Sequence, residues 1–340
     1  MTRGGNCSVP EIDSALVTTY LTPENQEQLR KALEPAEVVF CKPDDTETIA
    51  KAIQKVDVAI LNSDVDDLIL TGPNLRWIHC CRAGLDKSAK PEIFERGIIL
   101  TSSSGRSAPA LAEHVLMFML ALTYDLPMLM KAKAEHRWAA TREYFYKTGM
   151  YGKTIGILGL GKTGREVARL AKMFDMKVLG WRRSTEVPEN VDVVYSTERQ
   201  DSLQPLLEAS DYVVLCTELN DQTWHTLGKK EFDWMKPSAF VINMGRGELI
   251  DEPVMIEALQ SGKIAGAGLD TFEVEPLPKE NPLWDMENVL ITPHITPRLP
   301  DREERALEYV YQNIEAYRKG SGFINRLTQK SIFTKGKVKG

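Results

Sequence analysis

Three polar segments, each preceded by an apolar run, carry residue types that can bind anions and exchange protons. Arg246 lies in INMGRGELID. Asp270, Glu273 and Glu275 lie in GAGLDTFEVEPLP, and His294 lies in VLITPHITP. Ligands of open α/β sheets bind outside the carboxyl ends of the strands. Histidine in addition changes its charge near neutral pH. These five side chains are therefore candidates for chemistry on a bound ligand.

A single arginine, glutamate or histidine after a strand more often packs or faces solvent, so the candidates count only as a set. We assign no catalytic role to the other histidines, which lack the paired spacing of ligands: His79, His114, His136 and His225. Cys80 and Cys81 are interpreted as packing thiols rather than nucleophiles. No chemistry in this interpretation requires a metal ion.

The segment GLGKTG places Gly159, Gly161 and Gly164 after the strand-like run TIGIL and before the helical run REVARLAKMF. In a dinucleotide-binding turn the first glycine bends the chain, the second admits the pyrophosphate, and the third lets helix and strand pack closely. A GxGxxG pattern alone is weak evidence, but its strand and helix flanks favour this function over a purely structural turn. Lys162 and Thr163 would then open the helix whose N-terminus faces the phosphates.

The next apolar run ends in WRRS, where NAD-binding proteins usually show an acidic residue. Arg182, Arg183 and Ser184 occupy this place. Asp175 lies too early and Glu186 lies past the strand end, so neither is a convincing ribose acceptor. Because arginine accommodates a 2′-phosphate, we predict NADP(H) as the preferred cofactor, with NAD(H) possible. Two solvated arginines in a loop are the alternative.

Short apolar runs alternate with helical stretches in two series, one at residues 14–100 and one that begins after Gly149 and Gly152. The strand cores are expected in ALVTTYL, AEVVF, VDVAIL, RWIHCC, GIILTSS, KTIGILGL, MKVLGWR, VDVVYS, DYVVLCT, AFVINMG, KIAGAGLD and NVLITPH. This alternation is typical of parallel βα units, so both series predict doubly wound α/β domains. Between them, Ser107 and Pro109 mark a helix start, and residues 110–136 predict one long apolar helix. Residues 302–320 predict an amphipathic helix before a frayed tail.

Length and composition agree with a two-domain globular protein. The chain has 340 residues, 43% of them hydrophobic, and a formal net charge of −6. This charge offers no overall attraction to nucleic acid or to an anionic membrane. Five cysteines without metal-site spacing fit free thiols in a reducing compartment, so we expect a cytoplasmic protein. No run predicts a membrane span or a signal peptide.

Ordered segments at compatible spacing carry a family resemblance over nearly the whole chain: AGLD (83–86), ALAEHVLMFMLAL (110–122), GKTIGILGLGKTGREVA (152–168), MKPSAFVINMGRGELIDE (235–252), GAGLDTFEVEPLP (266–278) and NVLITPHIT (288–296). Together they resemble the D-isomer-specific 2-hydroxyacid dehydrogenase family. The resemblance selects Arg246, His294 and the acid before the proline, Glu275, and it leaves Glu273 aside.

The resemblance implies a role for each of these side chains. His294 would donate a proton to the C2 carbonyl oxygen of the substrate while the reduced nicotinamide delivers hydride to C2. Glu275 would hold the other ring nitrogen of His294, and Arg246 would bind the substrate carboxylate and the polarised carbonyl.

Substrate and cofactor contacts outside this triad are also implied. Backbone amides around Ala83 and Gly84 would hold the substrate carboxylate, and Asp270 would contact the nicotinamide carboxamide. Arg82 departs from the small or uncharged residue often found before the AG pair. It could touch an acidic substrate, or it could be a solvated loop residue.

The expected architecture has the cofactor domain, residues 105–297, inserted into a flavodoxin-like substrate domain, residues 1–104 and 298–340. The active site would lie in the cleft between them, and the long apolar helix would support a homodimer. The predicted activity is NADPH-dependent reduction of a small 2-oxoacid, with glyoxylate or hydroxypyruvate as first candidates. The alternatives are an NAD-dependent dehydrogenase of another D-2-hydroxyacid or of phosphite, and a corepressor-like protein that senses dinucleotides.

Overall fold

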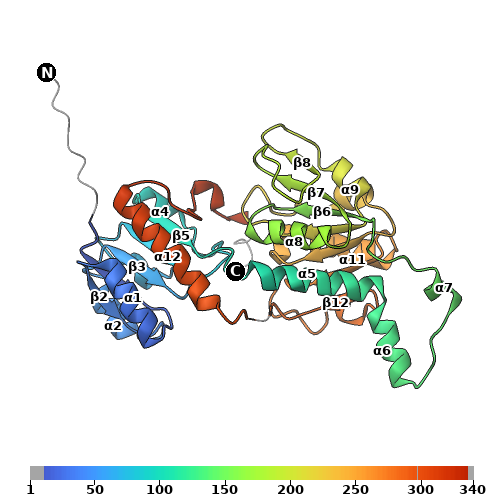
Figure 1. Cartoon of the computed structure of the whole chain (residues 1–340), viewed down its shortest axis with the longest axis horizontal. Coiled ribbons are helices and arrows are strands. Elements are labelled where there is room, and N and C mark those ends of the chain that lie inside the picture. The colour runs from blue at the N-terminus through green and yellow to red at the C-terminus, as the bar shows by residue number, and fades with distance from the viewer. Residues whose placement is uncertain (1–10, 297, 336–340) are drawn as a thin grey trace. The chain divides into compact units, whose positions relative to one another are not determined.

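The computed structural model describes residues 11–296 and 298–335, and it divides into two compact units (Figure 1). The first contains the chain up to Arg106 together with Leu299–Thr334. The second contains Ser107–Arg298 and is joined by Lys335. Cys7 and most of the basic C-terminal tail lie outside the described residues.

Within the described residues, the first unit is built on a parallel sheet with the strand order β2-β1-β3-β4-β5. This is the flavodoxin-like order, as the sequence predicts. The strands are β1 (Ser14–Val17), β2 (Glu37–Phe40), β3 (Val58–Leu61), β4 (Trp77–Cys80) and β5 (Ile99–Ser102). All of them fall within the expected apolar runs, except that β1 begins at Ser14, one residue before its run.

Helices cover both faces of this sheet, because successive strand residues point to opposite sides. On one face Val17, Val58 and Trp77 pack against α1 (Pro23–Leu33) and α12 (Arg302–Lys319). On the other face the sheet packs against shorter helices: α2 (Thr46–Ala52), α3 (Asp67–Leu70) and α4 (Pro91–Glu95). A short 3₁₀ turn, η3 (Gln329–Ser331), follows α12. The doubly wound fold of this unit follows directly from this arrangement.

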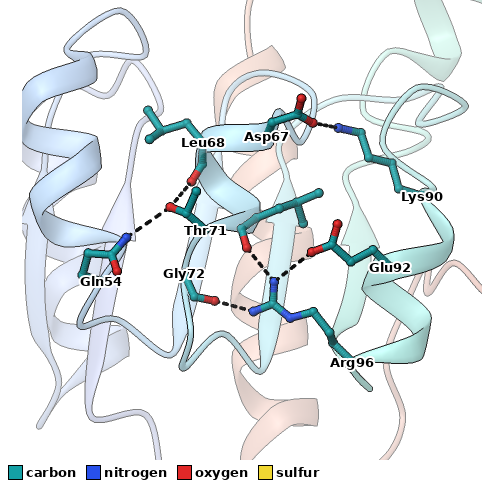
Figure 2. Close-up of polar contacts among 9 residues, drawn as sticks. Gln54, Asp67, Leu68, Thr71, Gly72, Lys90, Glu92 and Arg96 are labelled. Carbon is teal, nitrogen blue, oxygen red and sulfur yellow. Dashed lines mark hydrogen bonds and ion pairs between the residues drawn. The ribbon is translucent and has the colours of Figure 1, made fainter.

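Arg96, just after α4, holds the chain at the end of α3 (Figure 2). Its Nη1 donates to the carbonyl oxygen of Leu70 at 2.6 Å, and its Nη2 donates to that of Gly72. The same guanidinium lies 3.4 Å from the carboxylate of Glu92. The last carbonyls of a helix lack partners within the helix, so Arg96 stabilises this turn by satisfying them.

The second unit is built on a parallel sheet with the order β12-β11-β10-β9-β6-β7-β8 in the described residues. The strands are β6 (Thr154–Leu158), β7 (Lys177–Arg182), β8 (Val193–Ser196), β9 (Tyr212–Leu215), β10 (Phe240–Asn243), β11 (Gly266–Leu269) and β12 (Val289–Ile291). If β6 to β11 are numbered 1 to 6, their order in the sheet is the Rossmann order 3-2-1-4-5-6. The direction of winding reverses at β6, between β7 and β9.

The remaining elements of this unit flank the sheet or project from it (Figure 1). They are α5 (Ala108–Thr123), α6 (Leu126–Ala134), α7 (Arg142–Phe145), α8 (Lys162–Lys172), α9 (Gln204–Ala209), α10 (Lys229–Trp234), α11 (Glu252–Gln260), η1 (Gly247–Leu249) and η2 (Pro282–Asp285). Helix α5 packs against α8 and against β10 and β11. Its central position explains its apolar composition, since Val115, Phe118 and Met119 are almost fully buried.

The prediction of one long helix over 110–136 is wrong, because the chain breaks between α5 and α6. Asp125 adopts a left-handed conformation with φ +51°, and Pro127 cannot donate a helical hydrogen bond. The two helices meet at a bend of 63°. In the described residues, no helix by itself has the length and apolar character of a membrane span, and this bent pair passes that test only when both helices are counted together.

The cysteines of the described residues are free thiols. Burial raises the pKa of Cys81 and of Cys216 to about 12. A thiol that stays protonated is a poor nucleophile, which agrees with the interpretation of Cys80 and Cys81 as packing residues.

His79 is a fully buried histidine whose two ring nitrogens are both hydrogen-bonded. Nδ1 lies 2.8 Å from the Thr101 hydroxyl, and Nε2 lies 2.9 Å from the Ser103 hydroxyl. The Ser103 hydroxyl donates to the carbonyl oxygen of Ala306, so it accepts the proton of Nε2. Burial, aided by the charge of Arg106, lowers the pKa of His79 from 6.5 to about 3.

We expect His79 to make the stability of the protein depend on pH. Because its pKa is lower in the folded state, its contribution is present above pH 6.5 and is lost as the pH falls toward 3. Between pH 6.5 and 5 the wild type should lose about 2 kcal/mol that a His79→Gln variant does not lose. Urea unfolding of both proteins across this range measures the difference. A difference that stays constant with pH would contradict the prediction.

Candidate functional site

The glycine-rich turn after β6 has the geometry that a dinucleotide needs. Gly159 has φ +99°, and a Cβ there would lie 2.6 Å from the backbone nitrogen of Thr217, which follows β9. A Cβ on Gly164 would lie 2.0 Å from the carbonyl oxygen of Gly159. A Cβ on Gly161 would meet nothing within 4 Å. The outer glycines therefore allow close packing, whereas the middle one leaves open space in front of the helix.

Helix α8 begins directly at this space. Gly161 is its N-cap residue and makes no side-chain cap, and Lys162 and Thr163 form its first turn. The first backbone N–H groups of a helix lack partners within the helix, and they suit an anion. The turn also lies where the winding of the sheet reverses, which is where doubly wound sheets bind ligands. The residues present thus fit a dinucleotide.

Arg182 ends β7, as the sequence predicts, but its guanidinium already has a carboxylate partner. Its Nη1 lies 3.3 Å from Oε2 of Glu186 and 3.1 Å from the Glu186 carbonyl oxygen. Arg165, in α8, lies 3.6 Å from the same carboxylate. Two arginines therefore converge beside the end of β7, and sequence analysis had singled out only the first of them.

Arg183 and Ser184 follow in the same loop. The Arg183 side chain is exposed, and its carbonyl oxygen accepts from the Ser196 hydroxyl at 2.6 Å. Burial raises the pKa of Glu218, and the positive charge of Arg183 opposes this shift. The arginine thus lies close enough to Glu218 to affect its ionisation, at the carboxyl ends of β7 and β9.

His294 and Glu275 are brought together by the loops after β12 and β11. Nδ1 of His294 donates to Oε2 of Glu275 at 2.8 Å, while Oε1 of Glu275 accepts from the backbone N–H of Phe272 at 3.1 Å. The His294 side chain is 45% exposed, and no other described residue hydrogen-bonds its Nε2. Its backbone is left-handed, with φ +52°. The pair therefore presents one ring nitrogen outward and orients it through the other.

The Arg246 loop after β10 is packed tightly against the Glu275 loop. A Cβ on Gly247 would lie 1.9 Å from the carbonyl carbon of Phe272, so the two backbones touch where only glycine fits. Asn243, which is buried, donates to the carbonyl oxygen of Arg246 at 2.8 Å. Nη1 of Arg246 donates to the Gly245 carbonyl oxygen at 2.9 Å. Arg246 is thus anchored on the loop next to the one that carries Glu275.

Asp270 is a buried carboxylate at the end of β11. Its Oδ1 accepts from the Thr292 hydroxyl at 2.6 Å and from the backbone N–H of Ile295 at 3.0 Å. These contacts tie Asp270 to the segment that carries His294.

In the first unit, the predicted substrate loop follows β4. Gly84 has φ +69°, and Ala83 is exposed. Nη1 of Arg82 lies 2.8 Å from Oδ2 of Asp64, so Arg82 is held by an ion pair on its own unit. Arg106 follows the neighbouring strand β5, and it was missed by sequence analysis. Burial, and then the charges of Arg302 and Arg82, lower its pKa to about 10, so three arginines gather in this region.

Glu273, which the motif leaves aside, has a separate partner. Its Oε1 lies 2.8 Å from Nε2 of His225, and its backbone N–H donates to Glu252. Among the described residues, no cluster of three or more histidine, cysteine or acidic side chains is arranged to hold a metal ion.

Comparisons with known proteins identify the family of this chain. Residues 116–296 match the family model described as D-isomer specific 2-hydroxyacid dehydrogenase, NAD binding domain, which covers 181 of the 340 residues. The chain is 31% identical to D-3-phosphoglycerate dehydrogenase of Methanocaldococcus jannaschii over 88% of its own length and 56% of that protein. It therefore spans little more than half of this relative.

Two further proteins match over most of their length. Glyoxylate reductase of Korarchaeum cryptofilum is 30% identical over 85% of this chain and 88% of that protein. The NADPH-dependent glyoxylate/hydroxypyruvate reductase of Sinorhizobium meliloti, solved with NADP and sulfate, is 25% identical. Its structure matches with a TM-score of 0.73 over 94% of this chain and 99% of that one.

The second and third glycines of the turn should respond differently to a methyl group. Gly161→Ala has room and an ordinary φ of −75°, so its stability should stay within about 1 kcal/mol of wild type. Its Kd for NADPH should nevertheless rise by about tenfold, because the methyl group would point into the space in front of α8. Gly164→Ala should instead lose about 1–3 kcal/mol of stability through overpacking. Thermal unfolding and calorimetric titration test both, and unchanged binding by Gly161→Ala would contradict the assignment.

Proposed function

Since the chain belongs to the D-isomer specific 2-hydroxyacid dehydrogenase family of NAD(P)-dependent oxidoreductases, we propose that it reduces a small 2-oxoacid to the D-2-hydroxyacid with NADPH. The observation that carries this proposal is the hydrogen bond between His294 and Glu275, 2.8 Å long, at the carboxyl edge of the dinucleotide-binding sheet. An imidazole held at Nδ1 by a carboxylate has a fixed tautomer and keeps Nε2 for proton exchange.

Each of the proposed catalytic residues has one task. When bound, the reduced nicotinamide supplies a hydride to C2 of the oxoacid. His294 donates its Nε2 proton to the C2 oxygen, and in the reverse direction it accepts that proton. Glu275 stabilises the charged imidazole and keeps the ring oriented. The carboxylate of Glu275 is itself oriented by the Phe272 N–H, so the pair needs little rearrangement before the proton moves.

Arg246 and the first unit would bind the substrate. The guanidinium of Arg246 offers a planar fork for the carboxylate and the carbonyl oxygen of the oxoacid. In the first unit, the backbone around Ala83 and Gly84 would hold the same carboxylate. Arg82 is engaged with Asp64, and we assign it a supporting electrostatic role, together with Arg106, rather than direct contact.

The second unit would bind the cofactor through the glycine turn and the loop after β7. Lys162 and Thr163 would hold the pyrophosphate at the start of α8, and Asp270 would accept from the nicotinamide carboxamide. We propose NADP(H) as the preferred form because Arg182, Arg183 and Ser184 occupy the position of a ribose-binding acid. NAD(H) would bind without the phosphate contacts.

Two observations support this preference. Arg165 and Arg182 both lie near the Glu186 carboxylate, so a 2′-phosphate there would meet two positive charges and could take the place of that carboxylate. The Sinorhizobium meliloti reductase, whose fold this chain shares, was solved with NADP. Glyoxylate and hydroxypyruvate are our first candidates for the substrate, because related proteins bear the names of their reductases.

We also propose that the protein assembles as a homodimer through the segment that contains α6 and α7. This segment extends away from the sheet of the second unit (Figure 1). It exposes large apolar and aromatic side chains, with Trp138 93%, Phe145 76% and Tyr146 73% accessible in the single chain. Large apolar side chains that are exposed in the single chain are candidates for burial in a protein interface.

Purified protein should oxidise NADPH when given glyoxylate or hydroxypyruvate, and pyruvate, phenylpyruvate and branched 2-oxoacids complete the panel. His294→Ala should lower kcat by about 10²-fold or more, because the proton donor is lost. Glu275→Gln should lower it less, because the proton donor remains, although one amide oxygen cannot accept from both His294 and the Phe272 N–H and does not stabilise the charge of the ring. Absorbance at the NADPH band measures all three proteins. Binding of NADPH without turnover of any oxoacid would instead favour the dinucleotide-sensing alternative.

Arg182→Ala should weaken NADPH binding about 10- to 100-fold while NADH binding changes little, because a charge-assisted bond to phosphate is lost. Glu186→Gln should strengthen NADPH binding, since it removes the carboxylate that competes for both arginines. Arg169→Ala, which removes an exposed arginine of α8 paired with Glu166, is the matched control and should change neither Kd. Fluorescence titration gives the values, and equal losses for both cofactors in Arg182→Ala would refute the preference.

A further inference from the structure

His114 lies on α5 in the interior of the second unit, away from the motifs that define the proposed triad. Its ring is 6% exposed and packs on Phe118 with 4.8 Å between ring centroids. Both ring nitrogens nevertheless face hydroxyl groups of the segment that carries His294. Nε2 lies 3.2 Å from Oγ1 of Thr292, and Nδ1 lies 3.1 Å from Oγ1 of Thr296.

The direction of each hydrogen bond can be worked out from the number of protons available. The carboxylate of Asp270 only accepts, so the Thr292 hydroxyl donates its single proton to Oδ1 of Asp270 at 2.6 Å. Thr292 then has no proton for His114, and Nε2 of His114 must be the donor. Burial lowers the pKa of His114, which favours a neutral ring with one N–H. Nδ1 consequently accepts from the Thr296 hydroxyl.

This chain of bonds ends at the two groups nearest the proposed chemistry. Oδ1 of Asp270 accepts from Thr292 and also from the backbone N–H of Ile295, the residue after His294. The backbone N–H of His294 donates to the Thr292 carbonyl oxygen at 3.0 Å. Oδ2 of Asp270 has no hydrogen-bond partner among the described residues. It is therefore the oxygen left to accept from a ligand.

We propose that His114 is a positioning residue that, through Thr292 and Thr296, fixes the Asp270 carboxylate and the segment of His294 for the bound nicotinamide. By donating to Thr292, His114 forces the threonine proton toward Oδ1 and leaves Oδ2 for the nicotinamide carboxamide. By accepting from Thr296, it holds the segment on the C-terminal side of His294, as Thr292 does on the N-terminal side. This inference rests on the proposed function, because it presumes that a nicotinamide binds beside Asp270.

The chemistry of the side chains provides a matched pair of variants. In His114→Gln the amide nitrogen can reach the position of Nε2 and still donate to Thr292. In His114→Asn the shorter amide reaches only the position of Nδ1, so Thr292 loses its donor and its hydroxyl is free to turn away from Asp270. Thr123→Val serves as the control on the same helix, because it removes a buried hydroxyl that contacts the Tyr212 hydroxyl at 2.6 Å, outside this chain of bonds.

The first measurement is the Kd of NADPH without substrate, followed by kcat and KM for the best oxoacid and by thermal unfolding. We expect His114→Asn to raise the Kd of NADPH about tenfold and to lower kcat by a similar factor. His114→Gln should restore both to within about threefold of wild type. Thr123→Val should lower the unfolding temperature without changing Kd or kcat.

The outcomes separate this inference from the proposed function. If the wild type neither binds NADPH nor reduces any oxoacid, the proposed function fails, and the positioning role fails with it. If the wild type is active and His114→Asn matches it in Kd and kcat, only the positioning role is refuted. A His114→Asn variant that loses stability as Thr123→Val does, with unchanged Kd and kcat, also refutes it. The positioning role is also refuted if His114→Asn loses NADPH affinity and kcat but His114→Gln does not restore them.

Discussion

Within the described residues, every strand of both sheets runs parallel to its neighbours, and the proposed sites depend on this constraint. The carboxyl ends of parallel strands all lie at the same edge of the sheet, so loops that are far apart in the chain lie side by side there. In the second unit, Arg182 ends one strand, and the glycine turn, Arg246, Asp270 and His294 each follow a different one. A parallel sheet needs a crossover for every strand, which explains why these residues are spread over more than 130 positions.

Besides the side-chain hydrogen bonds between them, loops at this edge also touch through their backbones. Gly159 touches the backbone after β9, and Gly247 touches the backbone after β11. Neither contact tolerates a Cβ atom, so these glycines set the spacing between neighbouring loops. The separation between Arg246 and the Glu275 loop is therefore a property of the main chain, and it does not rely on flexible polar side chains.

Burial gives histidines of the same chain different chemistry. His79 is enclosed by hydroxyl groups, and burial keeps it neutral. His114 also contacts two hydroxyl groups, those of Thr292 and Thr296, and these link it to the carboxyl edge of the sheet of the second unit. His294 is half exposed and faces a carboxylate. A ring that holds one protonation state can orient its neighbours, whereas an exposed ring beside a carboxylate can exchange a proton.

The apolar periodicity of the sequence was enough to predict the strands and both doubly wound folds, because burial on both faces of a parallel sheet leaves continuous apolar runs. The helix start at Ser107 was predicted from Ser107 and from Pro109 near the first turn. It did not predict the break at Asp125, where one residue adopts a left-handed conformation inside an otherwise helical pattern.

Local order along the chain also located the glycine turn and the residues proposed for catalysis, since each lies in the loop that follows a strand. Only the tertiary structure decided which groups meet: Arg165 and Glu186 beside Arg182, Asp64 beside Arg82, and His114 beside Thr292. These contacts join segments on different elements. Their distances, and which group donates each proton, depend on how the elements pack, and residue types and spacing along the chain do not determine that packing.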